Sequence, residues 1–128
     1  MLTGGCFAER KILMIILTVR MHAFPEKQKE VMQTLLSMIE PTGKEKGCLS
    51  HDVFCDIEDK NAFSMLEAWE NREYLEHHLR SNRFGVLLGT RSLLAKPLKM
   101  KIHTVSHSEG VEVANALRGK GTSKKEGL

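Results

Sequence analysis

The 128-residue sequence has few cysteines and no recognisable metal-ligand spacing, which argues against two classes of small protein. Its three cysteines, Cys6, Cys48 and Cys55, are odd in number and include no Cys-x-x-Cys pair, so we expect no disulfide framework. Free thiols are typical of a reducing compartment, and we expect a cytoplasmic protein. The histidines and acids show no His-Glu-x-x-His pattern and no cysteine-rich spacing, so we expect no metal site.

The sequence also lacks a long apolar run and a basic face. Its apolar run from Ile12 to Leu17 is far shorter than the ~20 residues that cross a bilayer, and we expect no signal peptide before it. The 19 basic and 16 acidic side chains are intermixed, without interleaved aromatic residues. We therefore expect neither a membrane partner nor a nucleic-acid partner.

What the sequence does contain is an ordered series of strand and helix patterns. Strands are predicted at 11–22, 48–55, 62–70 and 98–105, where apolar or β-branched residues run together or alternate. Helices are predicted at 25–43, after a cap at Asn71, and around 84–88. This order predicts one α+β domain over residues 11–106, of the ferredoxin-like βαββαβ class with an antiparallel sheet. Residues 1–10 form an N-terminal extension.

Side-chain spacing predicts which residues face the core. In the first helix, an inner stripe is predicted from Val31, Leu35 and Ile39, with Met32 and Leu36 beside it. In the strand at 48–55, strict alternation puts Cys48 on the face opposite to that of His51 and Cys55.

The predicted sheet carries helices on only one face, although the strand at 11–22 is apolar on both sides. An exposed apolar face of this kind needs a cover. We expect a homodimer in which the sheet faces of two copies pack together. The tail at 107–128 is rich in glycine and charge; a short helix docked on a neighbour is predicted at 111–118, with disorder beyond it.

One acidic residue is predicted on an inner strand face. Alternation puts Glu67 beside Phe63, Met65 and Trp69. A buried carboxylate needs a partner or a raised pKa. We expect an ion pair with an arginine on a neighbouring strand, such as Arg20.

Two adjacent histidines follow on the next predicted helix. His78 falls on the apolar stripe with Tyr74, Leu75 and Leu79, which directs it towards the sheet, whereas His77 points to solvent. A histidine in such a stripe is more often a packed core residue than a catalyst. Both roles remain open for His78.

Residues 47–84, GCLSHDVFCDIEDKNAFSMLEAWENREYLEHHLRSNRF, resemble the antibiotic biosynthesis monooxygenase domain family. The likeness rests on a Gly-Cys strand, an acidic hairpin, a Glu-x-Trp strand end and a Leu-Glu-x-His-Leu helix, in that order. It extends over about residues 11–106. The resemblance implies a dimeric α/β barrel of ferredoxin-like protomers, each with a small-molecule cavity between sheet and helices.

Members of the family include cofactor-independent monooxygenases of quinols and polyketide phenols, haem-degrading enzymes, an isomerase and proteins without known activity. Trp69 matches the tryptophan of Glu-x-Trp, and His78 matches the histidine of Leu-Glu-x-His-Leu. Arg83 stands where the second family histidine falls, and His51 where many members have an aromatic residue. The strand asparagine of haem-degrading members has no counterpart, which argues against haem cleavage.

The resemblance and the residues together suggest oxidation of a small quinol or phenol without a cofactor. His78, as the base, and Trp69 are the expected catalytic residues. The expected substrate-binding residues are His51, Phe63, Met65, Glu67 and Phe84. The alternative is a noncatalytic dimer of the same barrel class that binds a small ligand or acts in stress. The expected partner is a small aromatic molecule.

Overall fold

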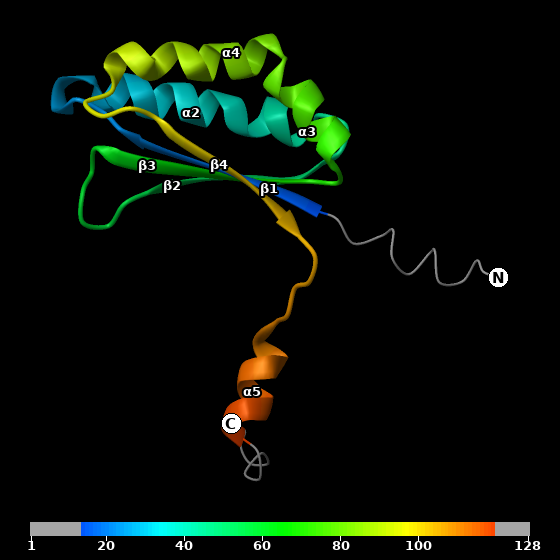
Figure 1. The fold of residues 1–128 in the computed structure, drawn as a ribbon. Helices are drawn as coiled ribbons and strands as arrows, with labels where there is room; N and C mark the ends of the chain where they lie inside the picture. Colours follow the sequence, from blue (N-terminus) through cyan, green and yellow to red (C-terminus); the bar gives the residue numbers. More distant parts are fainter. Residues whose placement is uncertain (1–13, 120–128) are drawn as a thin grey trace.

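The computed structural model describes residues 14–119, which form one antiparallel sheet with a layer of helices on one face (Figure 1). The strands are β1 (Met14–His22), β2 (Cys48–Cys55), β3 (Ala62–Trp69) and β4 (Lys99–Val105). The helices are α2 (Gln28–Gly43), α3 (Arg72–Leu79), α4 (Asn82–Gly89) and α5 (Val111–Gly119), with 3-10 turns η1 (Pro25–Lys27) and η2 (Thr90–Leu93). The predictions for residues 1–13 and 120–128 lie outside the described residues.

The sheet has the strand order β2-β3-β1-β4, with every neighbouring pair antiparallel. This is the ferredoxin-like βαββαβ arrangement, so the predicted fold class is confirmed. Along the central strand β1, Ile15, Leu17, Val19 and Met21 are buried, and the residues between them are only half-buried. The core therefore lies between the sheet and helices α2 to α4.

Helix α2 buries a stripe that differs in part from the predicted one. Val31 and Leu35 are buried as predicted, but Met38 takes the next buried position, Ile39 is half-buried and Leu36 is 54% exposed. A stripe that advances by four residues each time drifts round a helix of 3.6 residues per turn. The inner positions predicted for Ile39 and Leu36 are therefore wrong.

Helices α3 and α4 each begin at a side-chain cap. The Asn71 side chain accepts a hydrogen bond from the Tyr74 backbone N–H at 3.0 Å, which confirms the predicted cap. The Ser81 hydroxyl accepts one from the Phe84 backbone N–H at 3.2 Å. These caps set the break between the two helices at Ser81.

The start of β2 contains a β-bulge that strict alternation misses. The pairing register with β3 shifts between Cys48 and Ser50, which makes Leu49 the extra residue. Cys48 lies opposite the inward-facing Trp69, so it points to the same side of the sheet as His51. The prediction that Cys48 and His51 lie on opposite faces is therefore wrong.

Gly47, just before β2, has a backbone conformation that suits only glycine. Its φ is +85°, and a Cβ added there would lie 2.2 Å from Cγ of Tyr74. We expect Gly47→Ala to lower the free energy of unfolding by roughly 3 kcal/mol, through backbone strain and the clash together. Urea denaturation measures the loss. The control is Gly85→Ala, where nothing lies within 4 Å of the added atom; equal stability of the two variants would contradict the expectation.

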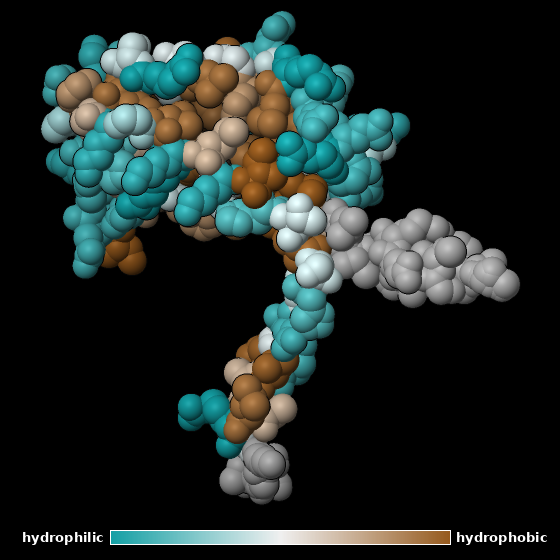
Figure 2. All heavy atoms as spheres, viewed as in Figure 1, coloured by the Kyte–Doolittle hydropathy of each residue, from teal (hydrophilic) through white to brown (hydrophobic). Residues whose placement is uncertain are grey.

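The sheet face away from α2, α3 and α4 is open among the described residues, and α5 lies on that side of the sheet (Figure 1). Apolar side chains on this face include Phe54, which is 50% exposed, and Leu66, which is 37% exposed. Apolar residues are also visible on α5 (Figure 2). Homodimer formation through this face stays a prediction. The helices in the described part of the chain are too short or too polar to cross a membrane.

Candidate functional site

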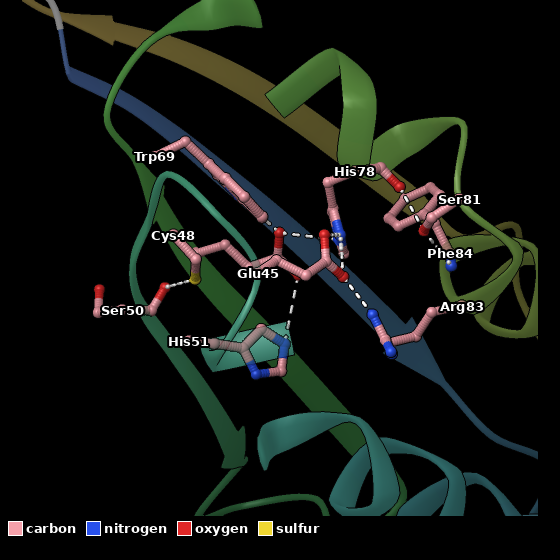
Figure 3. A network of polar contacts seen from close by, with 10 residues as sticks. Glu45, Cys48, Ser50, His51, Trp69, His78, Ser81, Arg83 and Phe84 are labelled. Carbon is pink, nitrogen blue, oxygen red and sulfur yellow. Dashed lines mark hydrogen bonds and ion pairs between the residues drawn. The ribbon is translucent and has the colours of Figure 1, made fainter. Parts of the chain in front are cut away.

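A buried carboxylate lies at the centre of the candidate site. Glu67 on β3 is 0% exposed, and its Oε1 accepts a hydrogen bond from Trp69 Nε1 at 2.9 Å. The same oxygen lies 3.3 Å from His78 Nε2, and Glu67 Oε2 lies 3.3 Å from His51 Nε2. Side chains from β2, β3 and α3 therefore converge on one point (Figure 3).

The partners of Glu67 differ from the predicted one. Arg20 forms an ion pair with Asp56 at 2.7 Å and donates a hydrogen bond to Ser64 at 3.1 Å. Leu17, and not Arg20, lies opposite Glu67 in the β1–β3 ladder. Because Arg20 is an odd number of residues from Leu17, it points to the open face of the sheet. The predicted Glu67–Arg20 pair is therefore wrong.

A second carboxylate connects the buried site to the surface. His78 Nδ1 lies 3.0 and 3.1 Å from the two carboxylate oxygens of Glu45, in the loop after α2. Arg83 of α4 donates a hydrogen bond to Glu45 Oε2 (Figure 3). The side chain of His78 is fully buried, that of Glu45 is 15% exposed and that of Arg83 is 36% exposed. The chain of contacts thus runs from the core to solvent.

Several buried polar atoms around Glu67 have no hydrogen-bond partner. Six buried side-chain nitrogen or oxygen atoms in residues 14–119 lack a hydrogen-bond partner, and four of them belong to His51, Glu67 and His78. The two 3.3 Å imidazole contacts are therefore close polar contacts without hydrogen-bond alignment. Buried polar atoms normally have partners, so this concentration calls for a functional explanation.

The network shifts the pKa values of Glu67 and His78 in opposite directions. Burial alone would raise the pKa of Glu67, but the contacts with His51, His78 and Trp69 outweigh it and lower the pKa to about 2. Burial alone would lower the pKa of His78, but Glu67 and Glu45 outweigh it and raise that pKa. The contacts therefore favour the charged form of each group, a carboxylate at Glu67 and an imidazolium at His78.

The Cys48 thiol, turned inward by the bulge, borders this network. Burial, together with the negative charges of Glu67 and Glu45, raises its pKa to about 11. A thiol with so high a pKa stays protonated at neutral pH and is a poor nucleophile. Cys48 therefore contributes packing to the site and no covalent chemistry.

Two aromatic rings enclose the His78 imidazole. Trp69 stacks on it with ring centroids 4.7 Å apart, and Phe84 meets it edge-on at 5.4 Å. The predicted site residues Phe63 and Met65 are buried on the same face of β3, but they lie four and two residues before Glu67, up to about 13 Å along the strand. The structure thus gathers five of the seven predicted residues: His51, Glu67, Trp69, His78 and Phe84.

Sequence reasoning missed Glu45 and assigned no role to Arg83. Glu45 lies in the short charged segment from Lys44 to Lys46, where no spacing distinguishes it from a surface residue. Arg83 stands where the family pattern places a histidine, and this was the available signal that its position borders the site. Within the described residues, no group of three or more His, Cys, Asp or Glu side chains is arranged to hold a metal ion.

The fold and site define a small ferredoxin-like α+β protein with a buried carboxylate–histidine network between sheet and helices. The family model for antibiotic biosynthesis monooxygenase matches residues 14–87, more than half of the chain. The chain belongs to this family.

The chain is also similar to individual proteins. The chain is 29% identical over 96 residues to the uncharacterized protein sll1783 of Synechocystis, covering 74% of this chain but only 65% of that protein. It is 29% identical over 86 residues to "Putative monooxygenase YcnE" of Bacillus subtilis, covering 66% and 90% of the two chains. A crystal structure of a conserved protein from Methanosarcina mazei Go1 is similar with 32% identity and a TM-score of 0.67, covering 73% and 93%.

Proposed function

We propose that the protein is a monooxygenase that oxidises a small quinol or phenol without a cofactor. The observation that carries the proposal is the cluster of four unsatisfied buried polar atoms on His51, Glu67 and His78. Trp69 and Phe84 beside this cluster suit a flat aromatic substrate. Membership of the antibiotic biosynthesis monooxygenase family supports the reaction class.

In this proposal, His78 accepts the proton of a substrate hydroxyl. Its raised pKa lies closer to that of a phenol, which makes proton transfer less unfavourable. Glu45 already binds Arg83, so it can turn towards that guanidinium and release Nδ1 of neutral His78 for the substrate. The imidazolium that forms is then stabilised by Glu67.

Loss of this proton leaves an electron-rich anion that reduces oxygen directly. One oxygen atom enters a ring carbon of the substrate and the other leaves as water, so a phenol and O₂ give a quinone and H₂O. The substrate supplies all the electrons. Trp69 and Phe84 hold the ring and exclude bulk water during these steps.

The second candidate is a noncatalytic ligand-binding or stress-related dimer. It is favoured by the close packing of the site, in which Glu67, Trp69 and His78 are each 0% exposed. In that case, the charged network stabilises the core and directs a bound ligand without reacting with it.

Oxygen uptake with a panel of dihydroxynaphthalenes tests the proposal, after subtraction of the rate without protein. Binding is followed in parallel through the fluorescence of Trp69, the chain's single tryptophan. Uptake together with binding supports the monooxygenase. Binding without uptake supports the noncatalytic alternative, and the absence of both contradicts the two candidates for this substrate class.

The pH dependence of turnover provides a further prediction. His78 must be neutral to act as the base, and its pKa is raised. We therefore expect kcat/KM to rise with pH, with the midpoint of the rise above the ordinary histidine pKa of 6.5. Glu45→Gln removes one of the charges that raise this pKa, so the midpoint should move to lower pH in this variant. An unchanged midpoint in Glu45→Gln would contradict the role of His78 as base. Glu40→Gln, an exposed change on α2, is the control.

We also propose a cytoplasmic homodimer that forms through the open sheet faces. The free thiols of Cys48 and Cys55 support a reducing compartment, and the exposed Phe54 and Leu66 support burial of the open face. Light scattering at micromolar concentration is expected to give twice the chain mass of 14.5 kDa. A monomer mass would contradict the dimer.

A further inference from the structure

The Glu45 carboxylate lies between two basic side chains that come from different helices. Its Oε1 and Oε2 lie 3.0 and 3.1 Å from Nδ1 of His78, on α3, and Arg83 of α4 donates a hydrogen bond to Oε2 (Figure 3). One carboxylate oxygen thus contacts His78 alone, and the other contacts both side chains. We call the position between His78 and Arg83 the carboxylate site.

The two basic side chains differ in how much they need an acceptor at the carboxylate site. The side chain of His78 is fully buried, so its Nδ1 cannot bind water instead if the carboxylate leaves. The side chain of Arg83 is 36% exposed, and its other N–H donors form no hydrogen bond or ion pair within residues 14–119. The site therefore requires an acceptor on its inner side and has spare donors on its outer side.

Glu45 can leave the carboxylate site by rotation of its side chain alone. Its backbone N–H donates to the Thr42 carbonyl and its carbonyl accepts from the Cys48 N–H, each at 3.0 Å. These bonds hold the turn in place. The Glu45 side chain is 15% exposed, and the exposed Lys44 and Lys46 flank it in the sequence. A displaced Glu45 carboxylate therefore reaches water and positive charge without rearrangement of the turn.

The chemistry of the carboxylate site favours an acidic ligand over a neutral one. A neutral hydroxyl group would replace one acceptor at His78 and leave Arg83 without the charge-assisted hydrogen bond that it now makes. A second carboxylate would satisfy both side chains, and a guanidinium suits a planar carboxylate especially well.

An aromatic acid with a hydroxyl group ortho to its carboxylate matches the site most closely. The internal hydrogen bond of such an acid places the hydroxyl oxygen about 2.5 to 2.7 Å from one carboxylate oxygen. The two oxygens of the Glu45 carboxylate are similarly close together. This ligand can therefore occupy the places of both Glu45 oxygens and still present a hydroxyl group to His78.

We propose that the carboxylate site binds an ortho-hydroxy aromatic acid, which displaces the Glu45 carboxylate. The ligand's carboxylate takes the place of Oε2, against Arg83, and its hydroxyl group takes the place of Oε1, against Nδ1 of His78. With a neutral quinol Glu45 keeps its bond to Arg83, whereas with an acid it gives up both contacts. The inference rests on the proposed function in that a small aromatic molecule binds beside His78, and it narrows the class of that molecule.

Calorimetric titration of the full chain with two naphthols tests the carboxylate site apart from oxygen chemistry. The probe is 1-hydroxy-2-naphthoate, and 1-naphthol is the matched ligand without the carboxylate. We expect the probe to bind about 10-fold more tightly or better, because it keeps a charge-assisted hydrogen bond with Arg83. Equal affinities for the two ligands, or no binding of the probe, would overturn the proposal.

The preference for the acid should depend on the guanidinium of Arg83. Arg83→Met keeps an apolar side chain of similar length, and we expect it to weaken binding of the probe about 10-fold while 1-naphthol binds as before. Arg80→Met removes the same charge from an exposed position three residues earlier and is the control. A melting curve checks that each variant is folded. Equal losses in the two variants, or unchanged binding to Arg83→Met, would overturn the proposal.

Displacement of Glu45 predicts the opposite sign for a variant of this residue. Glu45→Gln keeps the shape of the side chain but removes the charge that competes with the ligand. We therefore expect this variant to bind 1-hydroxy-2-naphthoate about 5-fold more tightly, with little change for 1-naphthol. Glu40→Gln, an exposed change on α2, is the control. Unchanged or weaker binding of the probe to Glu45→Gln would overturn the displacement.

Oxygen uptake then reports on the reaction separately from the carboxylate site. We expect 1,4-dihydroxy-2-naphthoate to be consumed with a kcat/KM about 10-fold above that of 1,4-dihydroxynaphthalene, and Arg83→Met to remove this difference mainly through KM. Tight binding of 1-hydroxy-2-naphthoate without oxygen uptake from either quinol would support the carboxylate site and contradict the monooxygenase. Uptake with equal kcat/KM for the two quinols would overturn the carboxylate site and support the monooxygenase.

Discussion

Replacing Glu67 with alanine is expected to lower the free energy of unfolding by about 3 to 5 kcal/mol, the usual cost of removing one partner from a buried ion pair. The change leaves the His78 imidazolium without its inner carboxylate and the Trp69 N–H without its acceptor. Urea unfolding followed by far-UV circular dichroism measures the loss. Glu70→Ala, on an exposed residue of the same segment, is the control and should stay within about 0.5 kcal/mol of wild type. Similar stabilities of the two variants would refute the structural role of Glu67.

The loss should depend on pH in a defined way. The pKa of Glu67 is lowered from 4.5 to about 2, so the stabilisation that its ionised form contributes is present above pH 4.5 and disappears as the pH falls towards 2. The pKa of His78 is raised, so the stabilisation that its protonated form contributes is fully present below pH 6.5 and disappears as the pH rises through the folded-state pKa. The difference between wild type and Glu67→Ala is therefore expected to be largest between pH 4.5 and 6.5.

Replacing His78 with alanine is expected to reduce turnover of a quinol or phenol by about 10²-fold or more, the usual scale of a lost general base. His77→Ala should remain near wild type, because the exposed His77 side chain points away from the sheet. The two variants remove the same group one position apart. Oxygen uptake of both, measured with one substrate panel, gives the comparison.

A core role for His78 makes a different prediction, in which activity falls only in proportion to the folded protein. A melting curve for each variant and the conservative variant His78→Gln separate the two roles. The introduced glutamine retains a polar side chain between the carboxylates but cannot act as the base, so this variant should recover stability without activity. Equal activity of His77→Ala and His78→Ala in folded protein would rule out the catalytic role.

Local patterns were sufficient to predict the fold because each strand and helix buries one side. The strand alternation of β1 and β3, the Asn71 cap and the inward turn of His78 follow directly from residue spacing. The bulge at Leu49 broke this rule, since one inserted residue reverses every side chain on one side of it. Spacing alone does not reveal where such an insertion occurs.

The site was harder to predict because its contacts connect distant parts of the chain. Spacing indicated that Glu67 is buried, but its partners depend on which strand face an arginine occupies. Glu45 lies 33 residues before His78, in a loop that carries no regular pattern. Just after Glu45, Gly47 turns the chain tightly against Tyr74, which lies on the same helix as His78.

The bulge in β2 has a consequence for solubility. β2 lies at one border of the sheet, where unpaired backbone groups invite a strand from another molecule to add on. Such addition requires a regular ladder of donors and acceptors, and the shift between Cys48 and Ser50 interrupts that ladder near the start of the strand. The same irregularity that turns a thiol inward therefore protects the newly folded chain against edge-to-edge aggregation.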